Sequence, residues 1–535
     1  MKKKFISLLM ASCMTATLLT GCGSSSTNTV KKDASGKVAL TAVVLKHPLT
    51  KKMAKIKWLK NIADKAGISV KYEEISADWD QKKGALLSSG DIPDLLIGAG
   101  GLTDADFVTY KGLFEDMSQY INEKDTPNIY KMFKDNPELK AISTQSDGKI
   151  YSLPKYQQYW PCTATRQFIN KQWLKNLGLK EPTTLDELYN VLLAFKEKDA
   201  NGNGDPNDEI PMDWGPGFGY YHATNMLGGA GITLSEGSFY GYFAEDGKIK
   251  NFFTDDRYKE LVSFLHKCYK AGLINKEVFT QDYTTYQSVA RGKGDTGKVG
   301  FSFGWERSDR FGNKLKDQYE VLAPVKFSAD QKENVSWSYD YNSLNYSGNM
   351  ISLSSKCSDK KAAMKFIDSF YQPETSVQVL FGDEGTCVKK ESDTEYSVLA
   401  PTDKNTDPGT WKWTNSLADD GPLYLPKSIK VNLGTDMASN AKDTKVFDDV
   451  FANVDLTKNV VPFVFLKYSE EDNSKLSLTN TNITNVCQAQ FATWVAEGGV
   501  EKGWDSYLKK AKETGIEDGI AITQKYYDKY IKANH

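Results

Sequence analysis

The sequence predicts an α/β protein with at least two lobes, because of the length of the chain and an alternating pattern near its start. At 535 residues the chain exceeds what one hydrophobic core ordinarily supports. Strand-like and helical segments alternate in this order: 38–45, 50–66, 68–75, 81–88 and 95–97. Such alternation is typical of a parallel sheet. The last segment is continuously apolar, which indicates a sheet covered on both faces.

The alternation continues farther along the chain. Phe168-Ile169 is strand-like, and the helical segment 173–177 is followed by Gly178, a residue that commonly ends helices. Thr184 and Glu187 have the spacing of a capping box at the start of another helix. Further helical patterns cover 258–271, 358–370 and 503–513.

The composition argues against a nucleic-acid partner and against a cysteine-based metal site. Lys plus Arg (67) nearly balances Asp plus Glu (69), so no strong field is available for nucleic acid. The 28 Tyr, 25 Phe and 11 Trp make the chain rich in aromatic residues. Beyond the N-terminal region five cysteines are widely spaced without a CxxC pair, which argues against a metal cage or a dense disulfide framework: Cys162, Cys268, Cys357, Cys387 and Cys487.

The N-terminus has the pattern of a lipoprotein signal peptide. Lys2, Lys3 and Lys4 precede an apolar run, and Leu19-Thr20-Gly21-Cys22 ends it. We therefore predict a signal peptide over 1–21 and a Cys22 that carries acyl chains such as palmitate. Cys13 is an alternative site, but it would leave too short an apolar segment. A membrane-spanning anchor is the other alternative, and the run is shorter than the roughly 20 residues that spanning requires.

The residues after Cys22 are small and polar, which predicts a flexible tether over 22–36. More than one acyl chain on Cys22 would give stable attachment to a bilayer. The sequence thus predicts a protein held on the extracytoplasmic face of the cell membrane.

Several short motifs, in a fixed order, resemble those of the extracellular solute-binding proteins of bacterial ABC sugar importers. They fit family 1, in the branch that includes LipO-like and alginate-binding members. The motifs are Ser89–Asp94, Leu113–Ser118, Asp147–Pro154, Leu177–Leu179 with Pro182–Thr184, Ala271–Ile274, Gly297–Gly300 and Gly382–Gly385.

The resemblance implies a two-lobed periplasmic-binding-protein-like fold, joined by a hinge, with a ligand cleft between the lobes. We expect the N-terminal lobe to contain 37–160 and about 300–350. The C-terminal lobe would contain 161–299 and about 351–535. The chain would cross between them near 154–165, 300–305 and 346–355.

Residues 199–210 contain oxygen donors at alternate positions and a glycine at the sixth, a pattern that wraps a calcium ion. Asp199, Asn201 and Asn203 would supply side-chain oxygens, and Asp205 a backbone carbonyl. An EF-hand has Glu at the twelfth position, where this chain has Ile210. The resemblance instead implies closure by the adjacent pair Asp208 and Glu209, with Asn207 an alternative to Asp208. A polar turn without an ion is the other interpretation.

A sugar presents apolar C–H faces and many hydroxyls, so its site needs aromatic surfaces beside carboxylates and amides. Segments with this mixture lie near the expected crossings. Trp305 and Trp413 are the predicted platforms. The predicted ligand-binding residues are Gln157, Tyr159, Trp160, Trp214, Trp305, Glu306, Asp340 and Trp413.

These features predict a substrate-binding lipoprotein that captures an oligosaccharide and delivers it to the permease subunits of an ABC importer. We expect a monomer with no catalytic residues and no nucleic-acid partner. The glycine-rich segment 292–298 lacks the Ser or Thr and the following helix of a phosphate-binding loop. Three alternatives stay open: a surface glycosidase or lyase, a sensory receptor of the same fold, and a receptor for a non-sugar solute.

Overall fold

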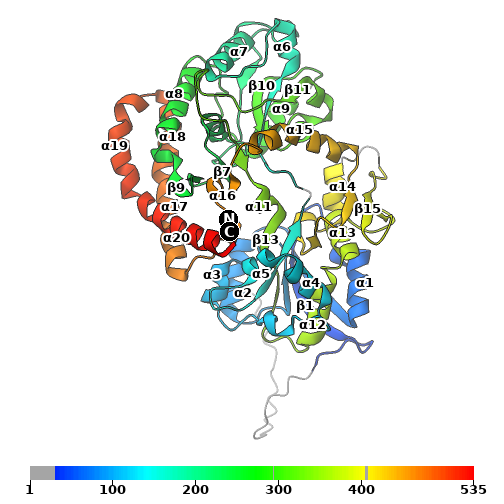
Figure 1. Cartoon of the computed structure of the whole chain (residues 1–535). Helices are drawn as coiled ribbons and strands as arrows, with labels where there is room; N and C mark the ends of the chain where they lie inside the picture. Colours follow the sequence, from blue (N-terminus) through cyan, green and yellow to red (C-terminus); the bar gives the residue numbers. More distant parts are fainter. Residues whose placement is uncertain (1–29, 159, 293, 404–405, 407, 535) are drawn as a thin grey trace, which may run out of the picture.

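The computed structural model describes residues 30–158, 160–292, 294–403, 406 and 408–534. Two α/β lobes lie one above the other in Figure 1, and both contain a mixed sheet with helices packed around it. The sheet of the N-terminal lobe has six strands, and that of the C-terminal lobe has four. This arrangement agrees with the predicted two-lobed α/β fold.

The N-terminal lobe is built on the strand order β16-β4-β13-β3-β1-β2. Its parallel core pairs β1 (Val38–Leu45) with β2 (Ile68–Ile75) and with β3 (Leu95–Ile97). All three residues of β3 are buried, as its apolar run predicts. The helices of this lobe are α1 (Lys57–Ala66), α2 (Trp79–Ser89), α3 (Asp104–Thr109), α4 (Pro127–Asp135), α5 (Pro137–Ser143), α12 (Lys360–Ser369), α13 (Pro373–Phe381) and α14 (Pro408–Asn415).

The first helix starts later than the sequence pattern indicates. A 3-10 turn covers Met53–Lys55, and Ile56 then adopts an extended conformation before α1 begins at Lys57. The helix ends at Gly67, whose φ of 72° is left-handed and whose N–H donates to the carbonyls of Ala63 and Asp64. The strand–helix–strand prediction is confirmed, with this difference at one boundary.

The C-terminal lobe has the strand order β11-β5-β10-β6. The strands are β5 (Arg166–Asn170), β6 (Ile210–Met212), β10 (Val299–Gly304) and β11 (Tyr319–Val321). Helix α6 (Lys171–Leu177) ends at Gly178 and α7 (Leu185–Glu197) begins after Thr184, whose hydroxyl accepts from the Glu187 N–H, both as predicted; α6 starts two residues earlier than its pattern indicates. The other helices before the C-terminal segment are α8 (Asp256–Lys270), α9 (Tyr283–Arg291), α10 (Arg307–Leu315), α15 (Thr435–Phe451) and α16 (Leu456–Asn459).

The predicted lobe boundaries need correction in their second segments. Strand β10 lies in the C-terminal lobe, because it pairs with β5 and β6. Conversely, β13 (Tyr346–Leu353) pairs with β3 and with β4 (Ser152–Gln157) in the N-terminal lobe. The buried core of the N-terminal lobe also includes residues from Cys357 to Val431. The sheet pairing and the core therefore assign 300–340 and 351–433 the opposite way from the prediction.

The chain crosses between the lobes after β4, before β13 and after β17 (Lys430–Asn432). The predicted crossing near 154–165 agrees with the first of these, and the crossing predicted near 346–355 lies just before that range. The predicted crossing at 300–305 is absent, because these residues form the buried strand β10 inside the C-terminal lobe.

The N-terminal segment joins the fold before the predicted end of the tether. Cys22 and the predicted signal peptide lie outside the described residues. Lys32 forms a β-bridge with Val38, and the Ala39 N–H donates to the Lys31 carbonyl over 2.8 Å. In the described part of the chain, no helix has the length and apolar character needed to cross a membrane.

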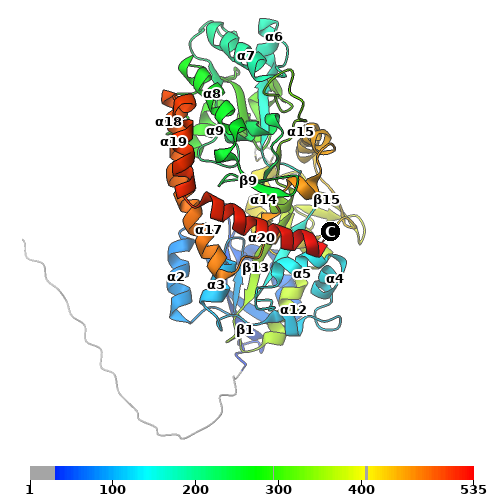
Figure 2. The same ribbon diagram turned by 60° about the vertical axis from the view of Figure 1, so that its left-hand side comes forward.

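The last helices lie along both lobes, on the side of the molecule away from α14 and α15 (Figures 1 and 2), with α17 against α3 of the N-terminal lobe and α18 against α8 of the C-terminal lobe. They are α17 (Glu470–Ile483), a π-helical turn (Thr484–Gln488), α18 (Ala489–Glu497), α19 (Val500–Glu513) and α20 (Ile516–Asn534). Just before them Lys467 Nζ lies 2.8 Å from Asp104 Oδ2 of α3. This ion pair joins the two lobes.

Candidate ligand-binding site at the lobe crossing

Trp160 lies in the first crossing and contacts both lobes. Its ring meets that of Trp305, at the end of β10, edge to face, with 5.7 Å between centroids and 82° between planes. Its indole N–H donates to Asp419 Oδ1 of the N-terminal lobe over 2.9 Å. One aromatic side chain thus connects a ring of one lobe with a carboxylate of the other.

Asp419 is the polar centre of this cluster. Besides Trp160, it accepts from Gln157 Nε2 over 2.9 Å and from Lys412 Nζ over 3.0 Å. Lys155 Nζ donates to the Asp419 carbonyl over 2.7 Å and lies 3.4 Å from Oδ1. Burial alone would raise the pKa of Asp419, but the ammonium groups of Lys412 and Lys155 hold that pKa well below its usual range.

Further aromatic faces border Asp419. Lys412 Nζ lies 4.3 Å from the ring centroid of Trp160 and 5.6 Å from that of Trp413. The Trp413 ring packs against His47 with 4.6 Å between centroids. Lys412 therefore joins the two tryptophans through cation–π contacts, and it neutralises Asp419 as well.

On the C-terminal lobe, cationic and acidic groups surround Trp305. Arg166, fully buried on β5, has its guanidinium carbon 5.2 Å from the Trp305 ring centroid, and it donates to the Trp305 carbonyl. Glu306 precedes α10 and accepts from the Ser308 hydroxyl over 2.8 Å. Burial raises the pKa of Glu306. Arg307 forms a bidentate pair with Asp443 at 2.8 and 3.0 Å.

Four predicted ligand-binding residues are therefore gathered around Asp419 at the crossing, with Glu306 next to them: Gln157, Trp160, Trp305 and Trp413. Tyr159 lies outside the described residues. Sequence reasoning missed Asp419, Lys412, Lys155 and Arg166. The position of Lys412 between two tryptophans, with Asp419 a few residues later, was the available signal.

Asp340 has a structural role instead of the predicted ligand contact. It is 0% exposed and accepts from the N–H groups of Ala164 and Gly237 and from the Ser338 hydroxyl, over 2.8, 3.1 and 2.8 Å. The carboxylate of Asp340 thus holds the backbone at Ala164 and at Gly237 in place. The prediction for Asp340 is corrected accordingly.

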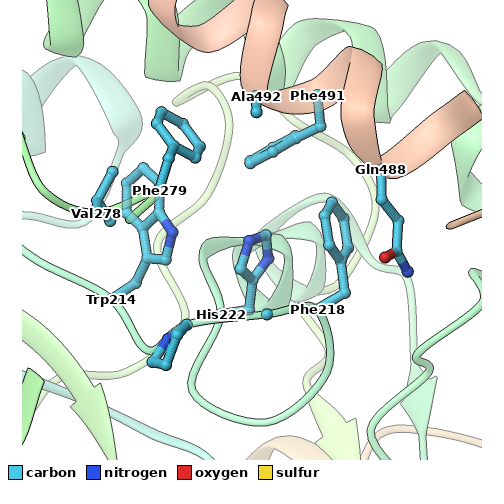
Figure 3. Close-up of a pocket in the computed structure, with 10 residues that line it drawn as sticks. Trp214, Phe218, His222, Val278, Phe279, Gln488, Phe491 and Ala492 are labelled. Atoms are coloured by element: carbon cyan, nitrogen blue, oxygen red, sulfur yellow. The ribbon is translucent and has the colours of Figure 1, made fainter. Parts of the chain in front are cut away.

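Trp214 is likewise away from the crossing cluster. It is 1% exposed and lines a small, partly open cavity of the C-terminal lobe, about 100 Å³ in volume (Figure 3). The rings of His222 and Phe279 face it edge-on with centroids 6.0 and 5.9 Å away. Trp214 therefore packs in the lobe interior, which corrects its predicted ligand contact.

The predicted calcium loop folds around its own oxygen atoms. Asp199 accepts from the N–H groups of Asn203 and Gly204 over 3.0 and 2.8 Å. Asp208 accepts from the amide groups of Asn201 and Asn203 over 2.7 and 3.1 Å. These contacts bring the donors at the two ends of the loop together.

The donor chemistry of this loop fits a hard cation. Glu209 Oε2 is buried and has no hydrogen-bond partner among the described residues. Burial, followed by the neighbouring Asp208, raises the pKa of Glu209. Across the described ranges, no group of three or more His, Cys, Asp or Glu side chains is arranged to hold a metal ion. Half of the expected calcium donors are Asn amides or carbonyls, which are oxygen ligands outside those four types.

Comparison with known proteins identifies the family. The family model for bacterial extracellular solute-binding proteins matches residues 57–386, and the chain belongs to this family. This match confirms the predicted family, whose members are binding proteins and not enzymes. The structure is similar to that of an extracellular solute-binding protein from Bifidobacterium longum subsp. infantis, with a TM-score of 0.85. The two sequences are 33% identical, and the match covers 94% of this chain and 100% of that one.

Two curated relatives are also similar. The fructooligosaccharide ABC transporter substrate-binding protein FusA of Streptococcus pneumoniae is 30% identical over 494 residues, 88% of this chain and 86% of FusA. The FusA structure with kestose has a TM-score of 0.79 at 26% identity, over 93% of this chain and 100% of that one. A FusA EF-hand mutant has been solved with fructo-nystose. Lipoprotein LipO of Bacillus subtilis is 27% identical over 303 residues, 55% of each chain.

Proposed function

We propose that this chain is the substrate-binding component of an ABC importer and that it captures an oligosaccharide where its lobes meet. The observation that carries the proposal is the double contact of Trp160, with Trp305 of one lobe and Asp419 of the other. The naming of FusA as a fructooligosaccharide transporter component supports the same role here.

The cluster at the crossing has the chemistry that a sugar needs. The faces of Trp160, Trp305 and Trp413 can stack on the apolar faces of sugar rings. Asp419 and Gln157 can exchange hydrogen bonds with hydroxyl groups beside them. A ligand that touches both lobes favours the closed arrangement, because only there can it bind the two lobes at once. The permease would then distinguish the closed, loaded protein from the open one.

The charges around the cluster favour a neutral sugar. Lys155 and Lys412 are paired with Asp419, and Arg307 with Asp443. Glu306 and Asp420 are two further acids in the same region, and Arg166 is one further cation. The cations named therefore do not outnumber the acids. A uronate would lose its hydration without finding an uncompensated cation, so we propose a neutral oligosaccharide.

The loop at 199–209 is the proposed calcium site. Asp199, Asn201, Asn203, Asp208 and Glu209 would provide side-chain oxygens and Asp205 its carbonyl, and the FusA EF-hand is a precedent in a relative. The loop lies in the C-terminal lobe, beside Lys298, which is 3.5 Å from Asp208. Bound calcium would stabilise the loop and take no part in contacting the sugar.

The lipid anchor on Cys22 remains part of the proposal. With the chain entering the fold at Lys32, a short tether would keep a monomeric two-lobed body next to the membrane and its permease. Labelling with a radioactive or clickable palmitate, compared between the wild type and Cys22→Ala, tests this anchor. Equal labelling of both would refute it.

Isothermal titration with kestose, maltotriose and trigalacturonate, using the full chain without its signal peptide, tests the site at the crossing. We expect a neutral trisaccharide to bind. Trp305→Ala should weaken that binding at least tenfold, equal to about 1.4 kcal/mol, because it removes a ring face beside Trp160.

Trp79→Ala is the matched control, since Trp79 is half-buried on α2 of the N-terminal lobe. It should keep the wild-type dissociation constant. An unchanged constant in Trp305→Ala would remove this cluster from the site. Preferential binding of trigalacturonate would contradict only the proposal that the ligand is neutral. Absence of binding across a broad saccharide panel would contradict sugar capture itself.

A further inference from the structure

A second, larger cavity lies on the far side of the hinge from α14 and α15. Its volume is about 570 Å³, within the range of small-molecule sites. It is bounded by the turn between β7 (Leu234–Ser235) and β8 (Tyr242–Glu245), by Phe463, and by residues of α17, the π-helical turn and α20. It shares no lining residue with the cluster around Asp419.

The backbone around this cavity departs from regular geometry at two places. Glu236 and Ser238 line it with φ angles of 50° and 42°, which are costly for residues other than glycine. On the opposite wall, Thr484 and Asn485 belong to the π-helical turn that joins α17 to α18. Strained residues and single π turns are both concentrated at functional sites.

Three polar atoms in the lining residues lack hydrogen-bond partners in the described part of the chain: Glu236 Oε1, Tyr242 OH and Asn480 Oδ1. The second oxygen of Glu236 accepts from the Val464 N–H over 3.2 Å. A buried polar atom without a partner is unfavourable by about 1–3 kcal/mol. Asn480 Oδ1 is an acceptor, whereas the Tyr242 hydroxyl and a protonated Glu236 can donate, so sugar hydroxyls, which both donate and accept, would satisfy all three after small side-chain movements.

The remaining walls combine aromatic rings with uncharged polar groups. Phe239 and Tyr240 are 43% and 40% exposed at the rim, unusually high for large hydrophobic residues. Asn473, Asn485 and the hydroxyls of α17 complete the lining, and among its described residues neither Lys nor Arg occurs. Aromatic faces beside amides and hydroxyls, without a cation, suit an uncharged polyhydroxylated ring.

We propose that this cavity is a second carbohydrate site, which binds one or two neutral sugar rings between the Glu236–Ser238 turn and helix α17. The rings of Phe239 and Tyr240 would stack on the sugar, and Asn480 and Glu236 would bind its hydroxyls. The site is separate from the proposed transport site at the lobe crossing, so the protein would bind saccharide at two independent positions.

Saturation-transfer NMR with sucrose and kestose tests the second site in a Trp305→Ala background, in which the site at the crossing is weakened. The saccharide signal should persist there. It should fall at least threefold when Ser477→Phe is added, because Ser477 lines the cavity and a phenyl ring would fill it. Leu478→Ala, one residue along α17 and 65% exposed, is the control and should leave the signal unchanged.

Asn480→Leu provides a second variant, and circular dichroism checks that each protein is folded. Loss of all saccharide signal in Trp305→Ala, or an undiminished signal after both Ser477→Phe and Asn480→Leu, would overturn the second site. A tight isotherm that survives Trp305→Ala would instead count against the proposed site at the crossing, so the two proposals fail separately.

Discussion

Asp419 and Glu236 are both partly buried acids, one at the lobe crossing and the other in the wall of the second cavity, yet their surroundings are opposite. Two ammonium groups and two N–H donors face the side chain of Asp419, and its pKa lies far below the usual range. Among the described residues Glu236 accepts from the Val464 N–H and has the Asn342 side chain as a further hydrogen-bond partner, but no cation lies within salt-bridge distance. Burial, and then the charge of Asp340, raises the pKa of Glu236 to about 8.

The difference shows that compensation, more than burial, sets the charge of an acid in this fold. The crossing retains an ionised carboxylate that can accept from sugar hydroxyls at any physiological pH. The second cavity holds an acid that is mostly protonated near neutrality, which suits an uncharged ligand. The calcium loop is a third case, in which acids depend on a cation from solution.

Removing the charge of Asp419 should have the largest effect on stability. Asp419→Asn leaves Lys155 and Lys412, both less than one-tenth exposed, without their carboxylate. Breaking such a pair from one side typically lowers the free energy of unfolding by about 3 kcal/mol. Urea denaturation followed by tryptophan fluorescence measures the change.

Asp420→Asn is the matched control for this experiment. Burial, and then Asp419, raises the pKa of Asp420 to about 6, so its neutral form is less costly and the variant should lose much less stability. A loss in Asp420→Asn as large as in Asp419→Asn would contradict the distinction between the two acids.

Calcium should have the next largest effect, on melting temperature. At a free concentration one hundred times its dissociation constant, an ion that binds only the folded state adds about 2.7 kcal/mol. We expect calcium to raise the melting temperature and Asp199→Ala to abolish the shift. Asp205→Ala should preserve it, because residue 205 is expected to supply its carbonyl. The absence of any calcium response in the wild type, after prior treatment with a chelator, would refute the site.

Glu236 should produce the smallest effect, visible as a dependence on pH. The pKa of Glu236 is raised from an ordinary 4.5 to about 8. Between pH 4.5 and about pH 8 the folded state therefore holds a proton that the unfolded state has already lost. The stability that this group contributes is therefore complete below about pH 4.5 and is lost as pH rises through about 8.

Glu236→Gln removes this proton exchange. Relative to the wild type, the variant should gain stability as pH increases from about 5 to about 8, by about 1 kcal/mol or more. Chemical denaturation at several pH values measures the difference. Tyr468 and Tyr530 lie near Glu236 but titrate well above this window. Parallel stability curves for the two proteins would show that Glu236 is solvated normally.

Much of the fold could be predicted because it is encoded locally. The strands β1, β2 and β3 and the caps of α6 and α7 follow from apolar runs and from Gly178 and Thr184. The second segment of each lobe could not be predicted. Strand β13 is inserted antiparallel between β3 and β4, and no local pattern specifies a partner so distant in the chain.

The site shows the same limit. Tryptophans next to polar residues marked Trp160, Trp305 and Trp413 as candidates. The residue that organises them, Asp419, is 262 positions from its partner Gln157, so only the folded chain reveals their contact. Trp214 and Asp340 have the same residue types in the same kind of segment, but burial gives them structural roles. Composition therefore identified the chemistry without the geometry.

The insertion of β13 also has a consequence for biosynthesis. Because β4 is separated from β3 until Tyr346–Leu353 has been made, the first lobe cannot complete its sheet while the chain is only partly synthesised. The core of the second lobe is completed later still, because it includes residues of α20, which ends at Asn534. Such long-range closure folds slowly, which leaves the nascent polypeptide open for most of its elongation, the condition that export through a narrow translocation channel requires.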